Sequence, residues 1–96
     1  MKDIFVPYVG NKPAAMYING HKLLILSTER EAFESQLEVL GADSVKRLKT
    51  TQSPKEQEKI ISKLAKKIKG GVVISPNNME LHDLIKNLEH ELPWVQ

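Results

Sequence analysis

The chain has no cysteine among its 96 residues. Disulfide frameworks, thiolate zinc sites and cysteine nucleophiles are therefore excluded together, and a reducing intracellular compartment is favoured. The sequence also lacks an N-terminal apolar segment typical of a signal peptide, and any run near the roughly 18 apolar residues that a membrane span needs. We therefore expect a cytoplasmic protein without membrane contact.

Groups suited to catalysis or metal binding are scarce. The chain has three histidines, His21, His82 and His90, and they share no spacing that would aim two of them at one substrate atom. The i,i+4 histidine pair that favours chelation on a helix is missing. We expect no catalytic residue, no metal and no cofactor. An enzymatic function stays an alternative only if folding forms an active-site cleft that is not visible in the sequence.

The sequence does contain enough apolar material for one small domain over residues 1–96. It is 41% hydrophobic and 27% charged, which is near the average for globular proteins. Its apolar patterns alternate between strand and helix periods and predict the order β-ββ-α-β-α-β-α. We therefore expect a small α/β (α+β) domain in which helices pack on a mixed sheet.

The pair Asn19-Gly20 lies between the apolar runs 14–18 and 21–26. Because a type I′ turn needs positive φ at both central residues, this pattern predicts a β-hairpin. The second run is continuous over residues 23–26, which predicts an interior strand. An earlier strand over residues 4–6 is expected to end at Pro7 or to lie at a sheet edge, since proline cannot donate to a ladder.

A second continuous apolar run covers residues 72–74, after Gly70-Gly71. The absence of alternation predicts a strand that is covered on both faces. We expect this strand to be the centre of the sheet, with helices 54–69 and 79–92 packed against it.

Three short motifs resemble those of a known family. They are Val6-Pro7, the step Ser27-Thr28-Glu29 before a helix, and the run 72–74 followed by Ser75-Pro76-Asn77. Over most of its length the chain is similar to the N-terminal domain of the SseB (enhanced serine sensitivity protein) family. The resemblance implies a small bacterial α/β domain without an assigned catalytic mechanism. The pattern departs at Ser75, where we would expect asparagine.

Charge is segregated along the chain. Residues 43–71 carry nine Lys or Arg against three Asp or Glu, whereas residues 28–42 and 72–96 are net acidic. In helix 54–69 the lysines lie opposite the apolar face, where they would either be solvated or neutralise phosphates. The absence of arginine and of interleaved aromatics from this stripe favours the solvated interpretation. The candidate polyanion contacts are Lys59, Lys63 and Lys66, with Lys46 and Arg47 upstream.

Trp94, the single tryptophan, follows Pro93 close to the C-terminus. Folding back onto the core is the favoured interpretation, but an exposed tryptophan would anchor a protein partner. Our leading hypothesis is a small non-catalytic module that acts through protein–protein contacts, with a homodimer as one form. The alternative is weak binding of nucleic acid or another polyanion through the basic face of residues 46–69.

Overall fold

The computed structural model of the chain describes residues 3–34, 37–48, 54–75 and 79–95. The elements follow the predicted order, with one additional two-residue strand near the N-terminus, and confirm an α+β fold. The radius of gyration is 12.8 Å, close to the value of about 12.5 Å expected for one compact domain of this length. In chain order the elements are β1 (Ile4–Val9), β2 (Lys12–Pro13), β3 (Met16–Ile18), β4 (His21–Leu26), α1 (Arg30–Glu34), α2 (Leu37–Leu40), β5 (Ser44–Leu48), α3 (Pro54–Ile68), β6 (Gly71–Ile74) and α4 (Leu81–Glu91).

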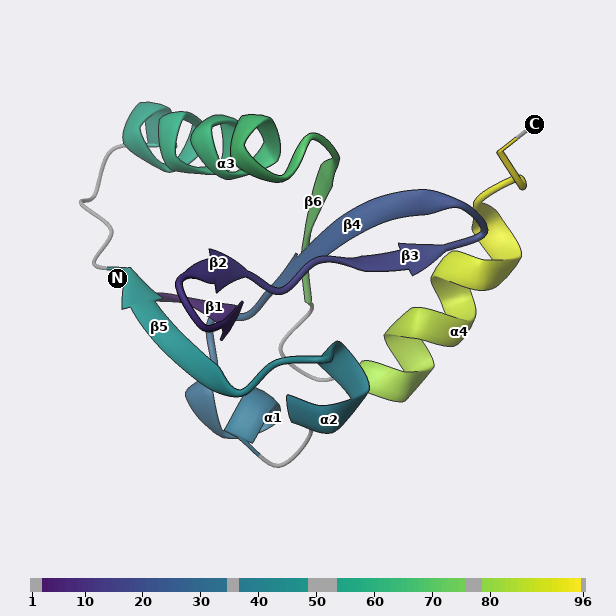
Figure 1. Cartoon of the computed structure of the whole chain (residues 1–96), viewed down its shortest axis with the longest axis horizontal. Helices are drawn as coiled ribbons and strands as arrows, with labels where there is room; N and C mark the ends of the chain where they lie inside the picture. Colours follow the sequence, from purple (N-terminus) through teal and green to yellow (C-terminus); the bar gives the residue numbers. More distant parts are fainter. Residues whose placement is uncertain (1–2, 35–36, 49–53, 76–78, 96) are drawn as a thin grey trace.

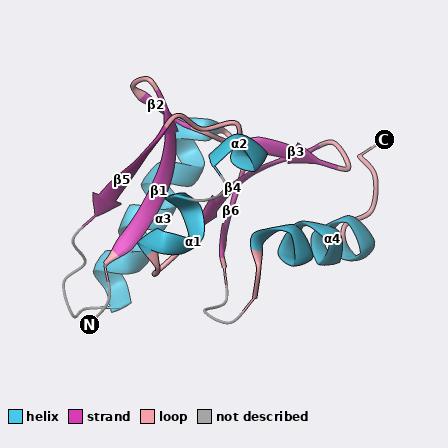
Figure 2. Cartoon of the chain, turned by 90° about the horizontal axis from the view of Figure 1, so that it is seen from below, coloured by secondary structure: helices cyan, strands magenta, loops and turns pink. Residues whose placement is uncertain are grey.

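The described strands form two three-stranded sheets, with orders β2-β1-β5 and β3-β4-β6. All the pairs are antiparallel except β4 and β6, which run parallel. Phe5 and Ser27 join the sheets by exchanging backbone hydrogen bonds of 2.7 and 3.1 Å. Helix α3 lies on one side of the strands and α1 and α2 on the other (Figure 1). Figure 2 shows the molecule from below, with β1 and β5 diverging from β4 and β6.

Strand β4 supplies both hydrophobic cores. Its alternate residues Leu24 and Leu26 are fully buried in a cluster that faces α3, whereas Ile25 is buried in a cluster formed with α1, α2 and α4. A strand that is covered on both faces needs apolar residues at every position, because successive side chains point to opposite faces. The prediction of an interior strand over residues 23–26 is therefore confirmed.

The predicted hairpin is also confirmed. Asn19 and Gly20 have φ values of 52° and 84°, and Ile18 pairs with His21 across the turn. Both central residues therefore have the positive φ of a type I′ turn.

Pro7 does not end the first strand or lie at a sheet edge, so that prediction was wrong. Strand β1 continues to Val9 and is the middle strand of its sheet. Both backbone groups of Phe5 bond to Ser27, so the backbone of Pro7, two residues later, faces the same side. On that side, β1 is paired with Ser27 at Phe5 and with strand β2 from Tyr8 onward. The missing N–H of Pro7 therefore falls where the ladder is interrupted, and its carbonyl accepts a bond from Ala14 N at 2.8 Å.

Strand β6 is not the centre of the sheet, which corrects the sequence prediction. Among the described strands it pairs with β4 alone, so it lies at the edge. Val72 packs on the α3-facing core and Val73 on the opposite core, but both are only half-buried. Ile74 is 44% exposed. The apolar run predicted correctly that each face contacts a core, but the cover is only partial, and the run carries no information about a neighbouring strand.

Glycines follow two of the helices, and each glycine is required for a different reason. Gly41 has φ of 67°, and bonds from Gly41 N to Glu38 O and from Ala42 N to Leu37 O close α2 in a Schellman motif. After α3 it is Lys69 that has positive φ, at 56°. Gly70 is needed because a Cβ there would collide with the backbone carbonyl of Lys22. Ser53, Asn77 and Asn78 precede α3 and α4 in the sequence and are of residue types that commonly cap helices, but they lie outside the described residues.

Candidate anion-binding groove

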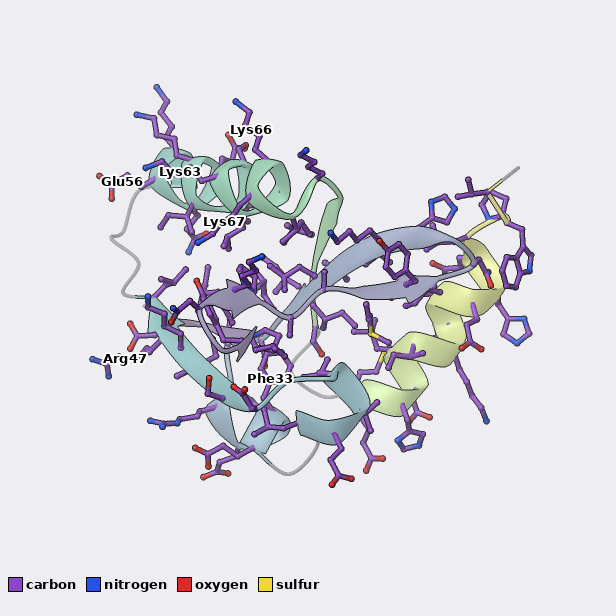
Figure 3. The ribbon with its side chains drawn as sticks, viewed as in Figure 1. Phe33, Arg47, Glu56, Lys63, Lys66 and Lys67 are labelled. Carbon is purple, nitrogen blue, oxygen red and sulfur yellow. The ribbon has the colours of Figure 1, made fainter. Side chains whose placement is uncertain are left out.

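The outer face of α3 carries the lysines that the sequence singled out. Lys59, Lys63 and Lys66 are all exposed, and Figure 3 shows Lys66 pointing away from the strands. These lysines share a broad, open hollow of about 830 Å³ with Glu56 and Glu58. The outer face therefore mixes charges of both signs, which weakens its field for an anion.

The two predicted basic residues of β5 lie on opposite faces. Lys46 is on the α3 side, where its Nζ lies 5.3 Å from the centroid of the Tyr8 ring. Arg47 is the register partner of Phe5, whose side chain packs in the opposite core. Its Nε lies 3.4 Å from Oδ2 of Asp3. The structure therefore separates Arg47 from the lysines of α3, because adjacent residues of a strand alternate between faces.

A different set of lysines lines a groove between α3 and strands β1, β2, β4 and β5. A larger cavity of about 580 Å³ is lined by Lys12, Lys22, Lys67 and Lys69. A smaller cavity of about 290 Å³ is lined by Lys63 and Lys67 together with Tyr8, Leu48, Ile60 and Leu64. Lys67 lines both cavities, so we treat them as one feature, the lysine groove. Among the described residues, no Asp or Glu lines either cavity.

The fold brings these lysines together from separate elements. Lys63 and Lys67 are one turn apart on the flank of α3, and Lys69 follows the end of that helix. Lys22 comes from β4 and lies beside Gly70, whose missing side chain permits the close approach of the two segments. Lys12 comes from β2, across the ladder from Val9. Of the residues singled out from the sequence, only Lys63 lines the groove. The other four lysines of the groove were missed because helix periodicity does not report contacts between distant segments.

The C-terminal tail presents Trp94 to solvent rather than folding it onto the core. The side chain is 73% exposed, so the favoured interpretation was wrong. The backbone around it is held by the hairpin turn. Val95 N donates to Asn19 O at 3.0 Å, and the ring N–H of His21 donates from Nε2 to the carbonyl oxygen of Pro93 at 2.6 Å.

Another group of polar side chains lies at the start of α4. The ring nitrogens of His82 lie 3.3 Å from a carboxylate oxygen of Glu80 and 3.3 Å from one of Asp83. All three side chains are exposed. They form surface ion pairs when the imidazole is protonated, and such pairs contribute little to stability.

No family model, curated protein or solved structure matches this chain. The resemblance to the SseB family therefore stays a prediction. Among the described helices, none is long and apolar enough to cross a bilayer.

Proposed function

We propose that this chain is a small non-catalytic binding module whose ligand is a phosphate-bearing polyanion held in the lysine groove. One observation carries the proposal. Five lysines, from β2, β4, α3 and the residue after α3, line one concave surface, and among the described residues no carboxylate lines it. These lysines are Lys12, Lys22, Lys63, Lys67 and Lys69.

The chemistry of lysine defines the kind of ligand. An ammonium group is a compact point charge with three donors, suited to phosphate oxygens, and it lacks the planar fork with which arginine reads a carboxylate or a guanine. Ammonium groups that line one surface repel one another, and an anion bound beside them offsets that repulsion. We expect binding that falls steeply with salt, with a log–log slope of about −3 if some four phosphates are neutralised on a single strand.

The groove suits an anion better than the outer face of α3, where the sequence hypothesis placed it. On the outer face Glu56 and Glu58 lie among the lysines and repel phosphate. The groove is also concave, and a concave wall of one sign focuses the potential that a ligand meets. The alternative hypothesis of polyanion binding is therefore kept, with a different set of contacts.

The test compares two double variants with the same change in net charge. Lys22→Gln/Lys67→Gln removes two positive charges from the groove. Lys59→Gln/Lys66→Gln removes two positive charges from the outer face of α3. Each is titrated with fluorescently labelled inorganic polyphosphate at low and at physiological salt. The groove variant should bind about tenfold or more weaker than the parent protein, while the outer-face variant should stay within about threefold. Equal weakening by both variants, or no salt-sensitive binding by the parent, would contradict the proposal.

The tail supports a second function, protein–protein contact through Trp94. An exposed tryptophan on a backbone that is already fixed loses little conformational entropy on binding, and tryptophan is enriched in interface hot spots. A partner with an apolar pocket, including a second copy of this chain, would take its indole. This is the leading hypothesis from the sequence, and the 73% exposure of Trp94 favours it.

Size-exclusion chromatography with light scattering tests the self-association form of this hypothesis. The parent protein should show a concentration-dependent dimer that Trp94→Ala removes, with thermal melts confirming that the variant is folded. A parent protein that stays monomeric at high concentration would exclude the homodimer.

A further inference from the structure

We infer that the polyanion is a single-stranded nucleic acid, with one base in the smaller cavity of the lysine groove and phosphates along the larger one. The inference rests on the proposed function and names its ligand class. It starts from a difference between the two cavities. The larger cavity has four lysines among its lining residues, whereas the smaller one is lined mostly by apolar side chains.

The smaller cavity has the composition of a site for a flat, uncharged ring. Tyr8, Leu48, Ile60 and Leu64 line it, and its volume of about 290 Å³ accommodates one heteroaromatic base. Leu64 is buried and the other three are half-buried. All four side chains belong to or pack against the hydrophobic core that faces α3. A ligand that carries phosphate alone would leave this apolar surface uncovered.

Tyr8 supplies the aromatic surface that the lysine stripe of α3 lacks. Nζ of Lys46 lies 5.3 Å from the centroid of the Tyr8 ring, a cation–π contact between an exposed lysine and a half-buried tyrosine. A stacked base contributes more binding free energy than such a contact, so the base can displace the ammonium group from the ring. Lys46 would then be free to meet a phosphate at the edge of the groove.

The apolar lining of the smaller cavity also favours a single-stranded nucleic acid over other polyanions. Inorganic polyphosphate has charge but no ring. Duplex DNA or RNA keeps its bases stacked inside the helix, where they do not reach Tyr8. A single strand exposes bases and phosphates at neighbouring positions, and Lys63 and Lys67 lie at the apolar cavity within reach of a flanking phosphate.

The experiment uses two Tyr8 variants and three probes. Tyr8→Leu keeps an apolar side chain but removes the aromatic ring, and Tyr8→Phe keeps the ring. The parent protein and both variants are titrated by fluorescence anisotropy with labelled oligothymidylate, a labelled mixed-sequence duplex and labelled inorganic polyphosphate. We expect Tyr8→Leu to bind oligothymidylate about tenfold weaker, Tyr8→Phe to bind within about twofold of the parent, and neither change to alter polyphosphate binding by more than about twofold.

A second measurement keeps the test decisive if Tyr8→Leu fails to fold. Oligonucleotides containing 5-bromouracil are photo-crosslinked to the parent protein, and the modified peptide is identified by mass spectrometry. Crosslinks at Tyr8 or at the 60–67 segment support the inference. Crosslinks confined to other peptides overturn it.

The outcomes distinguish this inference from the proposed function. If polyphosphate binds in the groove but the single strand binds no tighter than the duplex, or Tyr8→Leu weakens polyphosphate and oligothymidylate equally, the base-binding inference fails and the polyanion proposal stands. If no probe binds, both fail.

Discussion

The side-chain amide of Asn19 donates a hydrogen bond to the backbone carbonyl of Leu92 at 2.7 Å. It also donates to the carbonyl of Glu89 at 2.8 Å. The last four carbonyls of a helix lack partners within the helix, so the hairpin turn caps the C-terminal end of α4. One residue therefore forms the β3–β4 turn and fixes the helix that carries the Trp94 tail.

This relationship predicts a specific loss of stability in Asn19→Asp. Aspartate tolerates the positive φ of the turn, but its carboxylate has no N–H to donate and repels the carbonyl oxygens. The free energy of unfolding should fall by about 2 kcal/mol, which lowers the melting temperature by roughly 8–16 °C in a domain of this size. Thermal melts followed by circular dichroism measure the change.

Asn11→Asp provides the matched control. It makes the same chemical change at an exposed residue of the β1–β2 turn and should alter stability by less than about 0.5 kcal/mol. Similar losses in both variants would show that the added charge, rather than the cap, is responsible.

The central position of β4 predicts a ranking of alanine substitutions. Leu24→Ala removes a fully buried side chain and should cost about 2–5 kcal/mol. Val73→Ala, at a half-buried position of the edge strand, should cost less, and Ile74→Ala, at a residue that is 44% exposed, should cost least. Urea denaturation gives the three values. A loss of stability for Ile74→Ala as large as that for Leu24→Ala would indicate that β6 is an interior strand rather than an edge strand.

The approach of Gly70 to Lys22 predicts that Gly70→Ala is strongly destabilising. A Cβ at this position meets the backbone carbonyl of Lys22, which cannot move without shifting β4. We expect a loss of about 2–3 kcal/mol in urea denaturation.

Gly10→Ala is the comparison for that experiment. Its φ of 57° strains alanine, but no atom lies within 4 Å of an added Cβ, so only the backbone term of about 1–2 kcal/mol applies. A smaller loss at Gly70 than at Gly10 would contradict the close approach of the segments.

The five lysines that line the groove predict a salt-dependent gain in stability when two of them are neutralised. Without ligand, Lys22→Gln/Lys67→Gln should be more stable than the parent protein at low ionic strength by a few tenths of a kcal/mol, because like charges are removed. Since salt screens exposed charges, the gain should vanish near 1 M NaCl. Thermal melts across a salt series check this, and a variant that is less stable at every salt concentration would show that the lysines serve packing.

Features that depend on neighbours in the chain were predictable from the sequence. Asn19-Gly20 predicted the hairpin, because few residue pairs accept positive φ twice in succession. Gly41, which has positive φ, ends α2, and Leu81 and Leu84, three residues apart on one face of α4, are buried in the core. The continuous run of β4 predicted an interior strand, because each of its faces needs an apolar side chain.

Turn geometry and helix or strand periodicity are properties of adjacent residues, so the sequence predicted the main elements, their order and their apolar faces. The two-residue strand β2 was not predicted. The edge position of β6, the exposure of Trp94, and the placing of Lys12 and Lys22 in one groove with the lysines at the end of α3 depend instead on contacts between distant parts of the chain. Distances between residues far apart in the chain are set by which strands pair and how closely they approach. The contact of Gly70 with Lys22, which no local pattern encodes, is one of the approaches that bring the groove together.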